Sequence, residues 1–93
     1  MNPAQTHPRL AWEPSAQERY KLMIAKIPLF HREIAKIVVD KKAELNAIDR
    51  GASRVEEPDI VRAFLTEVPV AFYGLMVRLL DEVGFEHRKY ETK

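Results

Sequence analysis

Three histidines, His7, His31 and His87, have the widest chemical range in the chain, because imidazole can transfer a proton or bind a metal near neutral pH. No two of them have the four-residue spacing that places metal ligands on one helix face, and the motif His-Glu-x-x-His is absent. The chain also lacks cysteine, which excludes disulfides, thiolate zinc sites and iron–sulfur clusters. We therefore expect no metal site and no cofactor.

Three carboxylates lie close together in the sequence, at Glu56, Glu57 and Asp59, where paired acids could perform acid–base chemistry. Pro58 favours the first turn of a helix, and the helix dipole stabilises acidic side chains there. A helix N-terminus therefore explains the cluster without a catalytic role. The three glycines are too far apart for a phosphate-binding loop, and no serine lies in a nucleophile elbow. We expect no catalytic residues, and no enzymatic activity of the chain on its own.

The composition is typical of one soluble domain, with 93 residues of which 46% are hydrophobic and 31% charged. Lys plus Arg number 15 and Asp plus Glu number 14, so the net charge of +1 argues against nucleic acid as a partner. The longest uncharged run, residues 68–77, is far shorter than the roughly 20 residues that span a bilayer. The N-terminal residues also lack the apolar stretch of a secretory signal. These features predict a cytoplasmic protein that does not enter a membrane.

Hydrophobic periodicity predicts an all-α fold, a compact bundle of about four helices with a long central second helix. Residues 1–11 contain two prolines and no periodicity and are interpreted as a flexible leader. Residues 12–85 form a single helical domain, and residues 86–93 form a polar tail. For the first helix, Ser15 and Glu18 have the spacing of a capping box, and Pro14 offers a rival start.

The second helix is expected to extend over about 22 residues between Pro28 and Gly51, since neither Gly nor Pro interrupts it. Apolar residues recur in it at spacings of three and four, which is typical of an amphipathic helix. We expect this apolar face to point into the core. Its members are Phe30, Ile34, Ile37, Val38, Leu45 and Ile48.

The last two helices are separated by Pro69, with a short helix opened by Pro58 before it and a helix over about 69–83 after it. Gly84 is expected to end the last helix in a Schellman motif. This helix is apolar over more than half of its circumference, so Tyr73 and Met76 are candidate interaction residues. Two interpretations stay open: the helix is covered by its own chain, or it forms a surface for a homodimer or a protein partner.

Basic and acidic residues are unevenly distributed. Residues 19–42 contain seven Lys or Arg and two acids, whereas residues 43–70 contain three Arg and six acids. Such a polarity can guide docking to a partner or to a second copy of the chain.

The order of certain residues between positions 10 and 64 carries a family resemblance. A tryptophan precedes a proline and an alanine that open a helix, and Ile-Pro-x-Phe-x-Arg opens the long helix. A glycine turn and a β-branched residue then precede a further helix. The residues are Trp12, Pro14, Ala16, the string IPLFHR from Ile27 to Arg32, Glu44, Ala47, Gly51, Val55, Asp59 and Ala63. This pattern resembles the C-terminal domain of the B subunit of light-independent protochlorophyllide reductase, which also occurs as short stand-alone proteins.

The resemblance covers about 55 residues. The first two helices are about a turn longer here, and residues 65–93 have no counterpart. In the reductase this domain is a helical appendage near the pigment site, and catalysis belongs mainly to larger chains. The resemblance therefore implies a domain relationship. Together with the apolar last helix and the uneven charge, it favours a non-catalytic interaction or assembly module of this type, with a tetrapyrrole-linked accessory of a reductase complex as the alternative. We expect five residues to set the joint between the first two helices, namely Trp12, Ile27, Pro28, Phe30 and Arg32. Arg32 either binds a carboxylate, caps a turn or simply lies exposed.

A second resemblance is to the histone fold, in which a medium helix and a long central helix precede a short one. The turn with Arg54 and Val55, followed by an Asp-Ile pair that opens a helix, carries it. This resemblance implies dimerisation through the central helix and, in many members, binding of the DNA backbone. A histone-fold-like DNA-binding protein is thus a second alternative, against which the low net charge stands.

Overall fold

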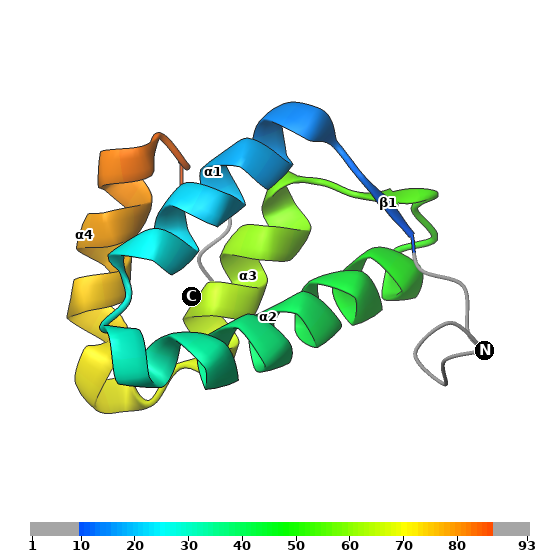
Figure 1. The fold of residues 1–93 in the computed structure, drawn as a ribbon. Coiled ribbons are helices and arrows are strands. Elements are labelled where there is room, and N and C mark those ends of the chain that lie inside the picture. The colour runs from blue at the N-terminus through cyan, green and yellow to red at the C-terminus, as the bar shows by residue number, and fades with distance from the viewer. Residues whose placement is uncertain (1–9, 87–93) are drawn as a thin grey trace, which may run out of the picture.

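The computed structural model describes residues 10–86, and these are built from four α-helices with short connections (Figure 1). The all-α fold and the long second helix predicted from the sequence are confirmed. Residues 1–9 of the expected leader and residues 87–93 of the expected tail lie outside the described residues. The elements in order are β1 (Ala11–Trp12), α1 (Pro14–Lys26), α2 (Leu29–Asp49), β2 (Arg54–Val55), α3 (Glu57–Glu67), the 3-10 turn η2 (Val70–Phe72) and α4 (Tyr73–Val83).

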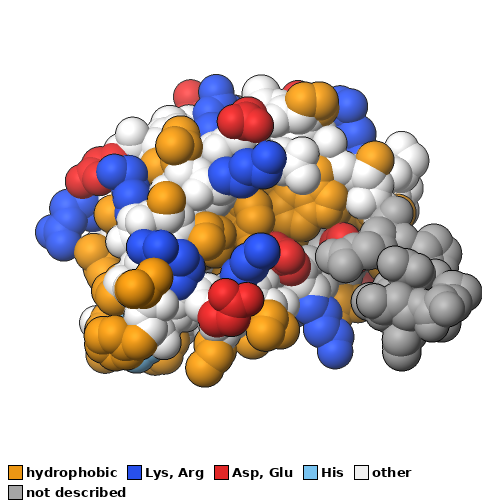
Figure 2. Space-filling view, viewed as in Figure 1, with side chains coloured by type: hydrophobic (Ala, Val, Ile, Leu, Met, Phe, Trp, Pro, Cys, Tyr) orange, Lys and Arg blue, Asp and Glu red, His pale blue; other side chains and the backbone are white. Residues whose placement is uncertain are grey.

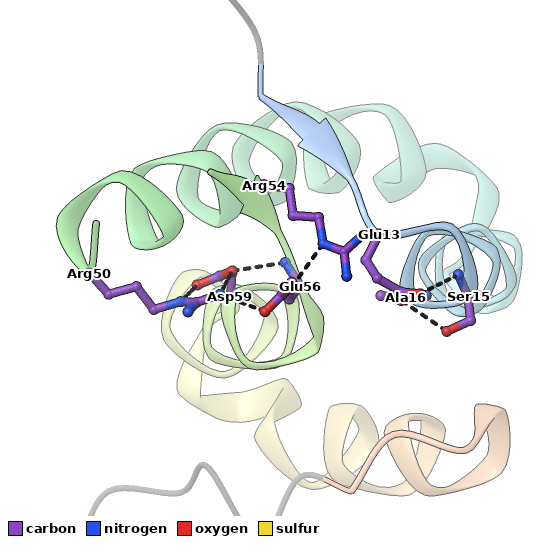
Figure 3. Close-up of polar contacts among 7 residues, drawn as sticks. All are labelled: Glu13, Ser15, Ala16, Arg50, Arg54, Glu56 and Asp59. Atoms are coloured by element: carbon purple, nitrogen blue, oxygen red, sulfur yellow. Dashed lines mark hydrogen bonds and ion pairs between the residues drawn. The ribbon is translucent and has the colours of Figure 1, made fainter. Parts of the chain in front are cut away.

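Helix α1 begins at Pro14, so the proline start is confirmed and the Ser15–Glu18 capping box is wrong. The preceding residue, Glu13, is the N-cap, and its carboxylate accepts a hydrogen bond from the N–H of Ala16 at 2.7 Å. Ser15 donates its hydroxyl to the same carboxylate at 2.9 Å instead of capping the helix itself (Figure 3). The bond from Ala16 lowers the pKa of Glu13. An acid just before the proline thus satisfies the free backbone donors of the first turn.

Proline and glycine set the other boundaries where the sequence predicted them. Pro28 separates α1 from α2, and Gly51 follows α2 with a left-handed φ of 74°. Gly84 ends α4 at a φ of 95°, and the N–H of Phe85 donates to the carbonyl oxygen of Leu80 at 2.9 Å, as in a Schellman motif. The helix expected over 69–83 is divided, because η2 precedes α4.

The orientation of α2 differs from the expectation. Its buried residues are Val39, Ala43 and Ala47, whereas Phe30, at 81% exposure, heads an apolar stripe on the opposite side. The predicted inner face is therefore wrong, apart from the half-buried Val38. Helix α2 packs chiefly on α3, and small side chains at the contact allow two helix backbones to approach closely. The residues assigned inward but found exposed are Phe30, Ile34, Ile37, Leu45 and Ile48.

The core forms where α3 passes behind α1 and α2, with α4 closing one end (Figure 1). Phe64 and Ile60 of α3 are wholly buried at its centre, together with Met23 of α1 and Leu80 of α4. The buried residues of α4 are thus covered by the protein's own chain. The apolar side chains left uncovered are mainly those of α2, η2 and the first residue of α4.

A short parallel strand pair joins the start of the described chain to the loop after α2. Ala11 pairs with Arg54 and Trp12 pairs with Val55, and the N–H of Glu13 donates to the carbonyl oxygen of Val55 at 2.8 Å. Ala11 was assigned to the leader from the sequence, whereas the structure places it in β1. The sequence could not show this strand, because two residues are too few to reveal an alternation of apolar and polar side chains.

Within residues 10–86, no single helix has both the length and the apolar character needed to cross a bilayer. One pair, α3 with residues Val70–Val83, reaches the required length and composition together, and it is bent by 120° at the break.

Candidate functional site

An apolar pocket of about 230 Å³ lies where the start of α2 meets η2 and α4. An apolar cavity of about 150 Å³ is enough to hold benzene, so this pocket has room for an aromatic ring. Apart from His31 and Glu67, every residue that lines it is apolar. The wall includes Ile34 and Val38 of α2, Phe72 of η2, and Leu75 and Met76 of α4.

The turn between α1 and α2 positions the mouth of this pocket. Pro28 stops α1 and directs the first turns of α2 past η2, so that the rings of His31 and Phe72 lie 6.2 Å apart between centroids. The ring of Phe30 lies 4.4 Å from that of His31 on the outer side. Ile34 and Ile37 continue the stripe along α2, with 67% and 61% of their surface exposed.

We call Phe30, Ile34, Ile37 and Phe72 the apolar face. In the space-filling view, hydrophobic side chains gather at the lower left and along the lower edge, where Figure 1 places the start of α2 and the turn before α4 (Figure 2). The pocket opens within this face, since Ile34 and Phe72 belong to both. The face therefore combines protruding apolar side chains with a hollow beside them.

Of the five interaction residues predicted from the sequence, Phe30 and Met76 lie at this region, and Tyr73 follows Phe72 in the chain. Phe30 belongs to the apolar face, and Met76 is buried as part of the pocket wall. Tyr73 begins α4 directly after Phe72 and is 40% exposed.

Arg32 lies at the joint between α1 and α2, where the sequence placed it. Its guanidinium donates to the carbonyl oxygens of Ala25 and Ile27, in each case at 3.0 Å, so it caps the end of α1. Of the three roles left open for Arg32, the structure shows the capping of a turn.

Trp12 lies apart from the pocket and packs on the body of the domain. Its indole N–H donates to a carboxylate oxygen of Glu44 at 3.3 Å, and its ring lies 5.0 Å from that of Tyr20. Tyr20 donates in turn to Asp40, and burial together with this hydrogen bond raises the pKa of Tyr20. Trp12 therefore anchors β1 to α1 and α2.

Sequence reasoning missed Ile34, Ile37 and Phe72 as surface residues and interpreted His31 as an ordinary surface histidine. The three-and-four spacing of the stripe was visible, but it was assigned to the core. No local signal could have placed Phe72 beside His31, because the two are 41 positions apart in the sequence.

The acidic cluster before α3 forms a closed network rather than an open site (Figure 3). Asp59 is wholly buried and receives two hydrogen bonds from Arg50, each of 2.8 Å. Glu56 and Asp59 form a capping box at the start of α3. The hydrogen bond from Arg54 lowers the pKa of Glu56, and the bond to Asp59 raises the pKa of Arg50. The interpretation of Glu56 and Asp59 as part of a helix N-terminus is therefore confirmed.

Over residues 10–86, no group of three or more His, Asp or Glu side chains is arranged to hold a metal ion. Comparisons of the chain with protein-family models, with curated proteins and with solved structures found no match. The two resemblances drawn from the sequence thus stay predictions.

Proposed function

We propose that this chain is a non-catalytic interaction module, of the type of the C-terminal domain of the protochlorophyllide reductase B subunit, that docks onto protein through its apolar face. The observation that carries the proposal is the exposure of Phe30, at 81%, beside an apolar pocket. Aromatic anchors and the pockets that receive them dominate the energy of many protein interfaces.

The apolar face lies outside the buried core of the domain. Helix α2 buries Val39, Ala43 and Ala47 against the rest of the chain, so the apolar stripe on its other side is not the surface that packs on the core. An uncovered aromatic side chain presents about 150–250 Å², and the largest apolar patch of a typical monomer covers about 300–600 Å². Four large side chains that are 44–81% exposed bring the apolar face into that range, and patches of this size are often functional, which supports the proposal.

Substitution on the face and away from it tests the proposal. We expect tagged wild-type protein, added to lysate of its native cells, to retain a specific binding protein that Phe30→Glu loses. The matched control is Leu22→Glu, because Leu22 is an exposed apolar residue of α1, at 53%, outside the pocket. Quantitative mass spectrometry of the three eluates is the measurement. Equal recovery with wild type and Phe30→Glu would contradict a docking role for this face.

The pocket favours a second candidate, a tetrapyrrole-linked accessory of a reductase complex. The exposed imidazole of His31 in the wall can serve as an axial ligand to the metal of a tetrapyrrole that lies across the mouth of the pocket, since a hollow of about 230 Å³ holds one ring and not the whole macrocycle. For this candidate, titration with an iron porphyrin should shift its absorption band, and His31→Leu should abolish the shift. No shift at tens of micromolar protein would exclude it.

The DNA-binding alternative gains no support from the fold. Arg50 and Arg54, its basic candidates in the turn, are paired with Asp59 and Glu56. Neutralised arginines contribute little to phosphate binding.

A further inference from the structure

We infer that the protein that docks on the apolar face is a second copy of this chain, bound antiparallel about a two-fold axis near Ile34. In this dimer Phe30 of each copy enters the pocket of the other. The inference rests on the proposed function and names its partner.

The face carries both an anchor and a receptor for that anchor. Phe30 protrudes at 81% exposure and is not part of the wall of its own pocket. The pocket of about 230 Å³ is apolar and large enough for a phenyl ring. A two-fold interface uses the same patch on both subunits, so the patch must be complementary to itself. The protruding ring of Phe30 and the apolar pocket on the same face meet this condition.

The spacing along α2 agrees with this arrangement. Phe30, Ile34 and Val38 lie four residues apart, so they follow one another on successive turns of the helix. With the axis at Ile34, antiparallel pairing places Phe30 of one copy opposite Val38 of the other. Val38 belongs to the pocket wall. The two Ile34 side chains meet at the axis, and Ile37 of each copy lies opposite His31 of the other.

The surface available suits a stable pair. A standard interface buries about 800 Å² per partner. Three further exposed apolar side chains extend the surface beyond the apolar face. Leu29 begins α2 and is 75% exposed, Val70 begins η2 and is 90% exposed, and Tyr73 begins α4 and is 40% exposed. On one flank, the same register places Glu33 of one copy level with Ala35 of the other, one residue from Lys36, so these opposite charges are offset by about 1.5 Å along the helix and symmetry repeats the pair.

Solution mass and mutation test the inference directly. We expect sedimentation equilibrium, from about 1 to about 500 µM protein, to show a monomer–dimer equilibrium for the wild type. Phe30→Glu should weaken the dimer at least about 100-fold, because each dimer loses the anchor twice. Leu22→Glu should leave the dissociation constant within about threefold of the wild-type value, since an exposed rim charge has little effect on affinity. Far-UV circular dichroism confirms that both variants are folded.

A cysteine placed at the axis tests the geometry, and the absence of natural cysteine removes any background. We expect Ile34→Cys to form a covalent dimer under mild oxidation, because residues at a two-fold axis can meet the spacing below about 7 Å that a disulfide requires. The matched control is Ile48→Cys, at an exposed position near the other end of α2. It should stay uncrosslinked.

A wild type that is monomeric at every concentration would overturn the inference. The proposed function would then stand if the captured protein is still lost with Phe30→Glu. A dimer unaffected by Phe30→Glu, or one that crosslinks through Ile48→Cys instead of Ile34→Cys, would also overturn it. If neither the dimer nor the captured protein depends on Phe30, both the inference and the proposed function fail.

Discussion

Replacing Arg50 with methionine is expected to lower the free energy of unfolding by about 3 kcal/mol, the lower end of the range for breaking a buried ion pair. Asp59 is wholly buried, and Arg50 provides two of its hydrogen bonds and its positive partner. Without Arg50, the buried carboxylate of Asp59 keeps, among the residues that the structure describes, only the hydrogen bond from the N–H of Glu56. The lower end applies because the Arg50 side chain is 36% exposed, so water reaches the pair. Urea denaturation followed by far-UV circular dichroism measures the loss.

The control for this prediction is Arg54→Met. Arg54 also binds a carboxylate, Glu56, at 2.9 Å, but both partners are substantially exposed. Exposed pairs contribute little, so this variant should unfold at nearly the wild-type urea concentration. If Arg50→Met is no more destabilised than Arg54→Met, the buried pair does not stabilise the start of α3.

The second large effect is expected from Phe64→Ala, which should lower the free energy of unfolding by about 3–5 kcal/mol. Phe64 is wholly buried on α3 and lies 6.0 Å from Tyr20 between ring centroids. Truncation removes buried apolar surface and leaves a cavity in the close-packed core. The midpoint of urea unfolding, with an unchanged slope, would report this loss.

The same truncation at Phe30 provides the matched comparison. Phe30→Ala should change the stability by less than about 0.5 kcal/mol at low micromolar concentration, because the side chain is exposed in the single chain. A loss at Phe30 comparable to that at Phe64, at a concentration where sedimentation shows a monomer, would contradict the exposed position of this side chain.

The boundaries of the helices were predictable because local residues determine them. Pro28 and Pro69 cannot continue a helix, and Gly51 and Gly84 adopt left-handed φ angles that other residues avoid. The cap at Glu13 was missed because Ser15 and Glu18 matched a familiar spacing. Only the structure shows that the carboxylate of Glu13, before the proline, accepts the hydrogen bond from the first turn of the helix.

The face that α2 buries was not predictable from its own sequence. Both sides of the helix contain apolar residues at helical spacing, the larger ones on one side and Val39, Ala43 and Ala47 on the other. The side with the larger apolar residues was predicted to face the core. In the structure the side with the smaller residues packs on α3. Which face of α2 is buried therefore depends on residues distant in the sequence. The same holds for the pocket, whose wall combines Val38 with Phe72 and Met76.

The pairing of Trp12 with Val55 has a consequence for how this domain opens. The two-residue strand pair closes a loop of more than forty residues, whereas the helices form from neighbours in the chain. So small a ladder has a low local stability, and its opening does not require the helices to melt. Trp12 is the only tryptophan, so intrinsic fluorescence reports the release of this strand, while amide exchange at α3 reports global unfolding.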